Sequence, residues 1–452
     1  MNEHDVSRLA SLLAGLLEEE ARNPVAPWRA PGQAPEGLDL SIPARGRGWD
    51  GLMPLLQAYI RATPKTATPR FLNQLYGGRL APAAVADALA SFLNNSMYTY
   101  KAAGLGVSVE DEVLAHMRRF AGFDQGEGAF APGGSVSNLM AMLVARNQRR
   151  PQAREQGLGP PALVVYASDQ SHYSVVKSAG VLGIGRDNVR LIESDAQGRM
   201  PPGALRAAII ADCARGREPF FLIATAGTTV LGAFDPIPAL ADVAQEHGLW
   251  LHVDAAWGGG ALLSPALRPL LNGCGRADSL TWDAHKMMGV PLLASVLLVK
   301  KEGLLEQSLS EEATYLFQSE DSGANPGVRS LQCGRRNDAL KVWAAWQFLG
   351  DEGYARRVDT LRRLALYAAE RIRRDRALRL AIEPEFVNIC FQVRGVDSQR
   401  LCQELDRRAL LKVGYGAFRG ETFIRLVFVN PDMTDSGVDE TLAIIKDTAR
   451  RL

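Results

Sequence analysis

Short apolar runs alternate with helix-like patterns along residues 70–334 of this 452-residue chain. Continuous Val, Ile and Leu runs are typical of strands buried on both faces of a sheet, and helices are the usual connections between parallel strands. The expected strands are Leu163–Ala167, Val189–Glu193, Phe220–Ala226, Trp250–Asp254, Ser279–Trp282 and Ser295–Val299. The expected helices are Ala83–Leu93, Val109–Phe120, Ser135–Arg149, Gly203–Arg215 and Ile237–His247. The pattern predicts an α/β fold whose mostly parallel central sheet binds ligands beyond the carboxyl ends of its strands.

The N-terminal segment departs from this alternation. Residues Val6–Ala21 place leucines at helical spacing, and residues Asn23–Arg47 are rich in Pro, Gly and Arg. An amphipathic helix followed by an extended arm cannot bury its apolar stripe alone. We therefore expect this segment to pack on a second subunit; the alternative is an ordinary first helix of a monomer.

The C-terminal part is a smaller α+β domain in this interpretation. Long charged helices are expected at Asn337–Leu349 and Tyr354–Arg374, and short strands at Asn388–Val393 and Phe423–Val429. The predicted domains are therefore 1–69 (helix and arm), 70–335 (large domain) and 336–452 (small domain).

The composition is that of an ordinary globular protein, with 47% hydrophobic residues, 22% charged residues and a net charge of +1. This balance gives no sign of a nucleic-acid or membrane partner. The longest apolar runs, such as Pro219–Ala226, are too short to span a bilayer, and the acidic N-terminus lacks the basic start of a secretory signal. The five cysteines form no CxxC pair, which favours reduced thiols in the cytoplasm over a disulfide or zinc framework.

Chemically versatile residues follow several of the expected strands. Lys286 lies in a tight His-Lys turn, where an amine removed from water can lose its proton and form an imine with an aldehyde. Asp254 ends an apolar strand and needs a cationic partner, such as the protonated pyridine nitrogen of pyridoxal phosphate (PLP). His172 could lie flat against such a ring. The glycine-rich turn Ala131–Asn138 opens a helix whose first backbone N–H groups can hold a phosphate.

Taken in this order, these motifs resemble one family, the group II PLP-dependent amino acid decarboxylases. The match is nearest to the glutamate and cysteine sulfinate decarboxylases. It runs through nearly the whole chain after Pro69, in the segments PRFLNQL (69–75), MYTY (97–100), APGGSVSN (131–138), ATAGTT (224–229), HVDAAWGGG (252–260), AHKMMGVPL (284–292), YLFQ (315–318), LQCGR (331–335) and EPEFVN (383–388). The resemblance implies the aspartate aminotransferase type of fold (fold type I), PLP as cofactor and a homodimer.

The resemblance also implies a role for each residue of the site. Lys286 would bind the cofactor's aldehyde and then move protons, Asp254 would keep the pyridine nitrogen protonated, and His172 would stack on the ring. The other cofactor-binding candidates are Gly134, Ser135, Thr225, Ser279 and His285, although a Gly-Gly-Ser turn is more often only a helix N-cap. The substrate-binding candidates are Phe71, Gln74 and Arg425. Arg425 would bind a substrate carboxylate, and the alternative is an edge-strand arginine that reaches solvent; no metal site is expected.

Two departures from the family's pattern bear on the chemistry. Asp283-Ala284 stands where the family usually has Asn-Pro, which adds a carboxylate able to hold charge on a lysine or a histidine. Close relatives carry a mobile loop with a tyrosine that is thought to protonate Cα after decarboxylation. The corresponding residues 319–330 are shorter and contain no tyrosine, phenylalanine or histidine, while their Gly, Pro and Asn residues are typical of a mobile lid. The proton would then come from His172, Lys286, Tyr315 or water.

The resemblance thus implies PLP-dependent removal of the α-carboxylate of a small acidic L-amino acid, with the amine and carbon dioxide as products. Aspartate, glutamate, cysteine sulfinate and a phosphono analogue all remain open as substrates. Because the loop tyrosine is missing, the alternative is a decarboxylation-dependent oxidase or transaminase that gives an aldehyde. A third hypothesis is a PLP-binding scaffold without catalysis, against which the complete set of Lys286, Asp254 and His172 argues.

Overall fold

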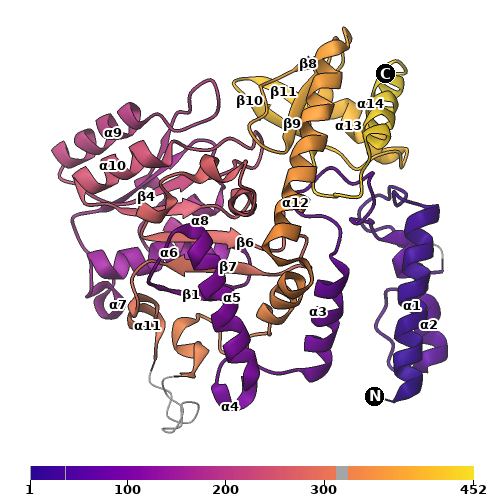
Figure 1. The fold of residues 1–452 in the computed structure, drawn as a ribbon, viewed down its shortest axis with the longest axis horizontal. Helices are drawn as coiled ribbons and strands as arrows, with labels where there is room; N and C mark the ends of the chain where they lie inside the picture. Colours follow the sequence, from indigo (N-terminus) through magenta and orange to yellow (C-terminus); the bar gives the residue numbers. More distant parts are fainter. Residues whose placement is uncertain (1, 36, 312–323) are drawn as a thin grey trace. The chain divides into compact units, whose positions relative to one another are not determined.

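The computed structural model describes residues 2–35, 37–311 and 324–452, and the chain divides into two compact units (Figure 1). The larger unit comprises residues 79–362 and 384–386, and the smaller one residues 1–78, 363–383 and 387–452. The N-terminal residues therefore group with the C-terminal ones. The division into 1–69, 70–335 and 336–452 stays a prediction.

The larger unit is built on a seven-stranded sheet in the order β1-β7-β6-β5-β4-β2-β3. The neighbours from β3 through β2, β4 and β5 to β6 run parallel, whereas β7 is antiparallel to both β6 and β1. The strands are β1 (Glu127–Ala131), β2 (Leu163–Ser168), β3 (Val189–Ile192), β4 (Glu218–Thr225), β5 (Trp250–Asp254), β6 (Ser279–Asp283) and β7 (Ser295–Val299). This mostly parallel sheet confirms the predicted α/β fold.

The strands agree closely with the apolar runs of the sequence, with one exception. Strands β5 and β7 have the predicted bounds, and β2 is one residue longer than expected. Strand β1 was missed because its five residues, EGAFA, contain no Val, Ile or Leu, although all five are buried. Strand β1 forms because it pairs with β7 at the edge of the sheet, although its residue types do not indicate a strand.

Helices pack around the sheet (Figure 1). Helices α5 and α6 contact β1 and β7, while α9 and α10 contact β4. The helices of this unit are α3 (Ala81–Leu93), α4 (Tyr100–Ala103), α5 (Leu105–Ala121), α6 (Gly134–Arg149), α7 (Ala153–Gln156), α8 (Ser174–Val181), α9 (Pro202–Ala214), α10 (Ile237–His247) and α11 (Leu304–Leu309). None of the described helices is both long and apolar enough to cross a membrane.

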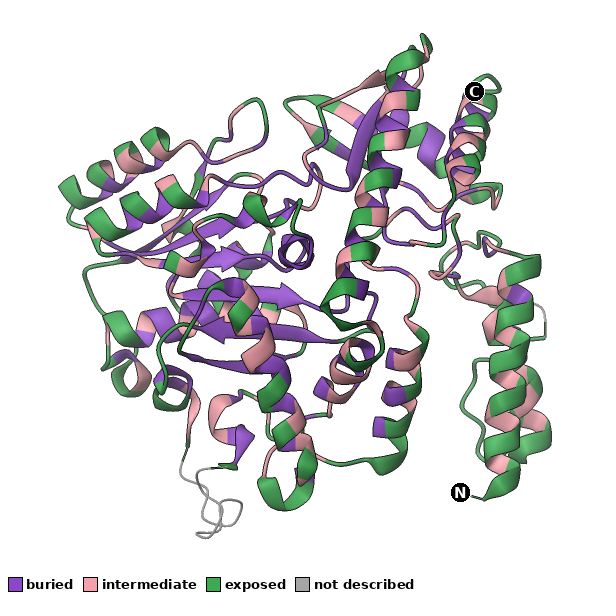
Figure 2. Ribbon diagram, in the orientation of Figure 1, coloured by how far each residue is buried: buried purple, intermediate pink, exposed green. Residues whose placement is uncertain are grey.

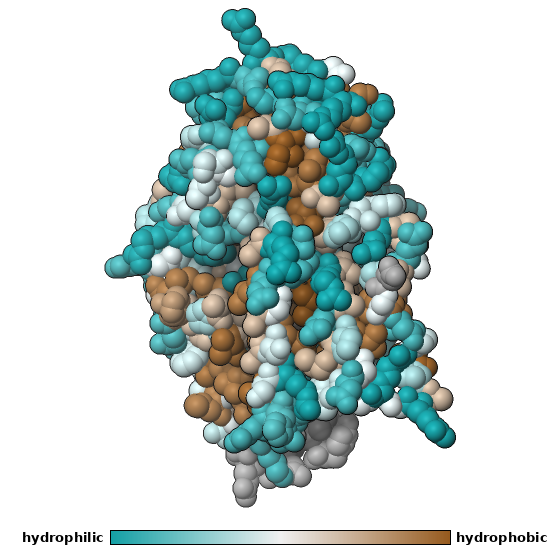
Figure 3. All heavy atoms as spheres, turned by 90° about the vertical axis from the view of Figure 1, so that its right-hand side faces the viewer, coloured by the Kyte–Doolittle hydropathy of each residue, from teal (hydrophilic) through white to brown (hydrophobic). Residues whose placement is uncertain are grey.

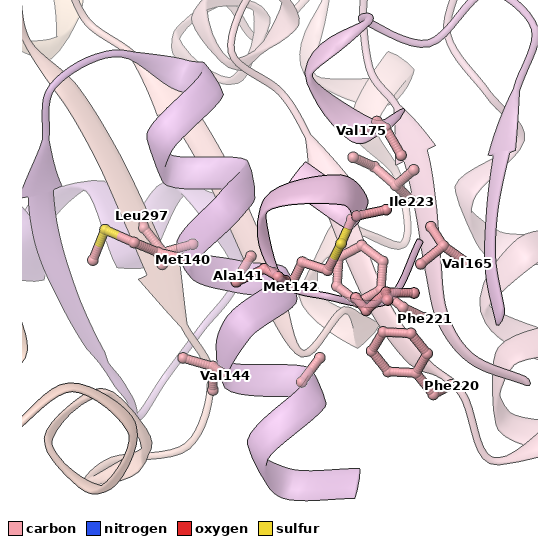
Figure 4. Packing of buried hydrophobic residues seen from close by; sticks show 14 of the residues in the cluster. Met140, Ala141, Met142, Val144, Val165, Val175, Phe220, Phe221, Ile223 and Leu297 are labelled. Carbon is pink, nitrogen blue, oxygen red and sulfur yellow. The ribbon is translucent and has the colours of Figure 1, made fainter. Parts of the chain in front are cut away.

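The core of the larger unit lies between α6 and the sheet. Figure 2 shows the strands buried along their length. Met140, Met142 and Val144 of α6 belong to one apolar cluster with residues of β2, β4 and β7. In Figure 4, α6 lies in the middle of this cluster, with Leu297 on one side and Phe221 on the other. This packing fixes the start of α6 against the ends of the strands, where the site is found.

The smaller unit contains an antiparallel sheet in the order β10-β11-β9-β8. Its strands are β8 (Leu378–Leu380), β9 (Asn388–Val393), β10 (Gly414–Phe418) and β11 (Glu421–Val427), and its helices are α1 (Glu3–Arg22), α2 (Gly48–Ala62), α13 (Ser398–Arg407) and α14 (Asp435–Ala449). The two predicted helices at 337–349 and 354–374 are joined in α12 (Ala339–Arg374). The backbone of α12 is non-helical at Gly350, with φ of 62°, and this break explains why the helical pattern is interrupted in the sequence.

Candidate active site

Three parallel strands end side by side in polar residues. In the register of the sheet, Thr225 of β4 pairs with Asp254 of β5, and Asp254 pairs with Thr281 of β6. Asp283 ends β6, and the backbone N–H of Lys286 in the following turn donates to the Asp283 carbonyl over 3.1 Å. The parallel arrangement thus brings these side chains to one edge of the sheet, as predicted for a ligand site.

Asp254 is held by two neutral donors. The Asn138 Nδ2 amide of α6 donates to Asp254 Oδ2 over 2.8 Å, and the Ala256 backbone N–H donates to Asp254 Oδ1 over 3.1 Å. The side chain is buried, and Asp254 is 6% exposed. Among the described residues, no lysine or arginine forms a salt bridge with this carboxylate, so the arrangement suits a cationic group that comes from a ligand.

Asn138 lies at the centre of a buried hydrogen-bond network. Its Nδ2 also approaches Ser174 Oγ at 3.3 Å, and its Oδ1 lies 3.1 Å from His252 Nε2. Because an amide oxygen only accepts, Nε2 of His252 carries the proton. His252 Nδ1 then accepts from the Ser279 hydroxyl at 2.8 Å. Burial lowers the pKa of His252 to about 4, so this ring is neutral at pH 7.

His172 joins the same network. The Ser174 backbone N–H donates to His172 Nδ1 over 3.3 Å, and Ser174 Oγ lies 2.9 Å from the same nitrogen. Since Nδ1 accepts, the neutral ring carries its proton on Nε2. Burial lowers the pKa of His172, and the carboxylate of Asp254 opposes this effect. The charges of Lys286 and Asp283 also act on this pKa, which places the four groups in one site.

Lys286 forms an ion pair with the carboxylate that ends β6. Its Nζ lies 3.2 Å from Asp283 Oδ2, and His285 Nε2 lies 3.5 Å from the same oxygen. His285 Nδ1 lies 2.9 Å from the Ala294 carbonyl oxygen, which fixes the ring. Burial lowers the pKa of His285. The sequence pointed to Lys286 and His285, whereas Asp283 stood out only as a departure from the family's pattern.

The glycine-rich turn lies against this carboxylate. Gly133 precedes α6 with φ of 95°, and its carbonyl accepts the N–H of Val136 and of Ser137. A Cβ added to Gly134 would lie 2.8 Å from Asp283 Oδ2 and 3.2 Å from the Cβ of Ala256, so only glycine fits without displacement. The first backbone N–H groups of α6 therefore lie beside the carboxyl ends of the strands, in the position expected of a phosphate-binding turn.

The other predicted cofactor-binding residues differ in their placement. Thr225 is brought to the site, because its Oγ1 lies 3.0 Å from the hydroxyl of Ser171 in the turn that carries His172. Ser135 is exposed in the first turn of α6. Ser279 stands at the opposite end of β6, fully buried, where it accepts the indole N–H of Trp250 over 2.8 Å.

The three substrate-binding candidates belong to the smaller unit. Phe71 is buried and forms a β-bridge with Lys412, and Gln74 is exposed. Arg425 of β11 is 8% exposed, and its guanidinium donates to the Asn73 carbonyl over 2.5 Å. Burial lowers the pKa of Arg425. A guanidinium bound to Asn73, the residue before Gln74 in the chain, suits the predicted carboxylate recognition, which stays a prediction.

The loop that lacks a tyrosine is described from residue 324 onward, whereas Tyr315 and residues 319–323 lie outside the described residues. Asn325 accepts the N–H of Tyr100 over 2.9 Å, and the Gly327 N–H donates to the carbonyl of Tyr98 over 2.8 Å. A Cβ on Gly327 would come within 2.6 Å of the Tyr98 ring. Residues 325–327 are therefore packed against Tyr98 and Tyr100 within the larger unit, and the mobile lid stays a prediction.

Comparisons with known proteins identify the family of this chain. Residues 31–394 match the family model described as the pyridoxal-dependent decarboxylase conserved domain. The chain belongs to the pyridoxal-dependent decarboxylase family. It is 40% identical to cysteine sulfinic acid decarboxylase of Mus musculus over 93% of this chain and 90% of the relative. It is also 39% identical to an acidic amino acid decarboxylase of Mus musculus over 94% of this chain and 82% of that one.

Solved structures of this decarboxylase family share the fold. The crystal structure of mouse CSAD has a TM-score of 0.92 and 37% identity and covers 98% of this chain, with 99% of its own length matched. The structure of Oryza sativa TDC with PLP and tryptamine also has a TM-score of 0.92, with 25% identity over 100% of this chain and 99% of its own. The protein is accordingly a PLP-dependent amino acid decarboxylase, which confirms the predicted family, fold and cofactor.

The residues at the strand ends fit PLP. They offer an amine for the aldehyde, a buried carboxylate for the ring nitrogen, an imidazole for the ring face and a glycine turn that a Cβ would fill. The hydrogen-bond network of this candidate site also contains residues that sequence analysis did not assign, namely Asn138 and Ser174. The available signal was a polar residue in the middle of the buried face of α6, since a buried amide is retained only where it makes hydrogen bonds.

Proposed function

We propose that this decarboxylase removes the α-carboxylate of a small acidic L-amino acid as carbon dioxide and leaves the amine. The observation that carries the proposal is the 40% identity, over 93% of the chain, to a protein named cysteine sulfinic acid decarboxylase. The arrangement of Lys286, Asp254 and His172 at the strand ends supports it. Aspartate, glutamate, cysteine sulfinate and a phosphono analogue are the candidate substrates.

The residues of the site have distinct tasks in this proposal. When bound, PLP supplies a pyridine ring that takes up the electron pair left by carbon dioxide. Asp254 keeps a proton on the ring nitrogen, and its two hydrogen bonds hold it in place for this task. His172 packs on the ring with its proton on Nε2. Lys286 binds the aldehyde through Nζ and, once released, moves protons.

Recognition of the acidic substrate is assigned to the three candidates of the smaller unit. Arg425 binds a substrate carboxylate, because a buried guanidinium prefers a planar anion as its partner. Gln74 contacts the substrate through its side-chain amide, and Phe71 lines the pocket that binds the substrate. The Arg425→Lys variant should raise KM for acidic substrates more than it lowers kcat, because the ammonium offers no bidentate contact.

A second candidate function is the formation of an aldehyde by decarboxylation-dependent oxidation or transamination. The observation that favours it is the absence of any tyrosine, phenylalanine or histidine from residues 319–330. In this case the electrons left by carbon dioxide pass to oxygen or to the cofactor instead of receiving a proton at Cα.

One experiment separates these functions. The purified protein, loaded with PLP, is incubated under air with aspartate, glutamate, cysteine sulfinate and, as an aromatic control, tryptophan. Carbon dioxide, amine, aldehyde and peroxide are measured together. Equal amounts of carbon dioxide and amine from an acidic substrate support the proposal, and aldehyde with peroxide supports the alternative. Turnover of tryptophan alone, or of none of the four, contradicts both; Lys286→Ala is the inactive control.

We also propose that the protein works as a cytoplasmic homodimer. Apolar side chains remain exposed on α1 and on the following arm: Val6, Leu13, Leu17, Leu40 and Ile42. The arm and α2 line a groove of about 580 Å³ with mostly apolar residues, and Figure 3 shows apolar residues among hydrophilic ones on the side of α1 and α2. A face of this kind is typical of a subunit interface. None of the five cysteines, all of which lie in the described residues, forms a disulfide, and this suits a reducing compartment.

Sedimentation measurements test the dimer. The wild type should sediment as a dimer, and a variant with Leu17→Asp and Ile42→Asp should sediment as a monomer because two charges would be buried in the interface. Val181→Asp is the matched control, since Val181 is an exposed apolar residue at the end of α8. A monomeric wild type contradicts the proposal.

A further inference from the structure

One carboxylate oxygen faces two basic groups at the end of β6. Asp283 Oδ2 lies 3.2 Å from Lys286 Nζ and 3.5 Å from His285 Nε2. Asp283 is 2% exposed, and its other oxygen, Oδ1, has no hydrogen-bond partner among the described residues. A buried carboxylate without other donors depends on the nearest cation for its charge.

The nearest cation is Lys286 rather than His285. Burial lowers the pKa of His285, so its ring is neutral at pH 7. His172 faces Asp283 from the turn before α8, and burial lowers its pKa as well. The charge of Lys341 reaches His285 from α12, but this ammonium is paired with Asp338 at 2.9 Å. Among the described residues, the ammonium of Lys286 is therefore the cation that remains for Asp283.

The position of Asp283 is fixed by the start of α6. The backbone at Gly134 lies so close that an added Cβ would be 2.8 Å from Asp283 Oδ2. The helix N-terminus favours a negative charge at this place. Asp283 thus has little room to swing away from Lys286, and the carboxylate stays beside Nζ between the amine and the glycine turn.

We propose that Asp283 is the counter-ion of Lys286, which keeps a positive charge on Nζ both in the free lysine and after Nζ has joined the aldehyde of PLP. The proposal rests on the proposed role of Lys286 and goes beyond it, because Asp283 is a residue in which this chain departs from its family's usual asparagine. Asp283 acts through Lys286 and is therefore a positioning residue, not a group that reacts.

The proton balance is simple. An ammonium and an aldehyde join through a carbon–nitrogen double bond, and one water leaves with the aldehyde oxygen and two hydrogens of the ammonium. The third hydrogen stays on Nζ, whose positive charge is retained beside the unchanged carboxylate of Asp283. No oxidant, reductant or further reactant takes part. A protonated nitrogen makes the adjacent carbon more open to attack by the amine of a substrate.

The first test uses the protein without PLP. Acetic anhydride labels only uncharged amines, and mass spectrometry reads the labelling of each lysine across pH. The labelling midpoint of Lys286 should fall by about one pH unit or more in Asp283→Asn, since an opposite charge at this distance shifts such equilibria by roughly 1–3 units. Lys301, which is exposed at the protein surface after β7, serves as the internal reference.

The second test uses the protein loaded with PLP. The protonated form of the bound cofactor absorbs at longer wavelength than the uncharged form, so a pH titration of the visible spectrum reports the charge on Nζ. The transition should lie at lower pH in Asp283→Asn than in the wild type, by about one unit or more. Asp283→Ser removes the same charge and should shift it in the same direction, should the asparagine variant fail to fold.

Asp278→Asn is the matched control. Asp278 directly precedes β6 and is partly buried, but its Oδ2 accepts the N–H of Leu251 over 2.8 Å at the opposite end of the strand from Lys286. This variant should leave both midpoints where the wild type has them. A visible band that responds to Asp278→Asn and not to Asp283→Asn would overturn the inference. Absence of any band in the wild type would instead overturn the proposed function, while the labelling result would still decide the ion pair.

Discussion

Two carboxylates end neighbouring strands of the same sheet, and their surroundings differ. Asp254, at the end of β5, accepts hydrogen bonds from two neutral groups, one at each oxygen. Asp283, at the end of β6, has a lysine and a histidine at one oxygen and no hydrogen-bond partner at the other among the described residues. The first carboxylate is prepared for a cation from the ligand, and the second already holds a cation of the protein.

This difference teaches that charge alone does not define a role in the site. A carboxylate held by neutral donors keeps its full charge for a cationic group of the ligand. Its burial costs desolvation free energy, which is offset only when that ligand binds. A carboxylate paired with a protein cation is neutralised in advance and tunes its partner instead. Four measurements can break or sharpen this comparison.

The largest effect is expected from Asp254→Asn. The variant keeps the shape and the contact with Ala256 but cannot keep a proton on the pyridine nitrogen, so kcat/KM should fall on the order of 10³-fold. Steady-state kinetics at saturating PLP measure the loss. Asp283→Asn should cost far less at the same pH, because asparagine is the residue usual in the family. Equal losses in the two variants would contradict the division of roles.

A smaller effect is expected when the support of Asp254 is removed. Asn138→Ala deletes the donor to Asp254 and leaves His252 Nε2 with only the hydroxyl of Thr281, at 3.3 Å, so kcat/KM should fall about 10–100-fold and PLP should bind more weakly. Equilibrium dialysis measures the affinity. Asn147→Ala, later on the same helix, is the control, because Asn147 contacts Ser308 outside the site. Unchanged PLP affinity in Asn138→Ala would show that Asp254 is held without it.

Acid should weaken the support of Asp254 through His252. Its pKa is lowered to about 4, so between pH 6.5 and about 4 the unfolded chain binds a proton there that the folded chain does not. This contribution to stability is complete above pH 6.5 and is lost as the pH falls toward 4, by at most on the order of 3 kcal/mol. Urea unfolding at pH 7.5 and 5 should show a smaller difference for His252→Gln than for the wild type. An equal difference in both proteins would contradict the neutral histidine.

The smallest effect on turnover is expected in the core. Met142→Ala removes a side chain that is 1% exposed, and the free energy of unfolding should fall by about 2–5 kcal/mol. The activity per folded molecule and its pH profile should stay as in the wild type, because no charge near either carboxylate changes. Urea unfolding and active-site titration measure both quantities. A shifted pH profile of activity would mean that a loss of core packing changes the site as much as a change of charge at Asp254 or Asp283 does.

The sequence allowed the fold and the main site residues to be predicted because both depend on local patterns. Apolar runs mark buried strands, and residues that follow them, such as Asp254 and Lys286, meet at one edge in a parallel sheet. The network around Asn138 could not be predicted, since it joins α6, β5 and the start of α8 at Ser174, which are distant in sequence. The position of Ser279 follows from strand direction: it is the first residue of β6, whereas ligands lie beyond the carboxyl ends of parallel strands.

The close approach of Gly134 and Asp283 couples two positions that lie 149 residues apart in the chain. A methyl group at 134 would push the carboxylate away from Lys286, so Gly134→Ala should reproduce the spectral shift of Asp283→Asn without altering any charge. With serine at position 283, the carboxylate that clashes with the added methyl group would be absent. Gly134→Ala would then cause almost no further shift in the spectral transition that reports the charge on Lys286. Such epistasis means that libraries for new substrate specificities should vary both positions together.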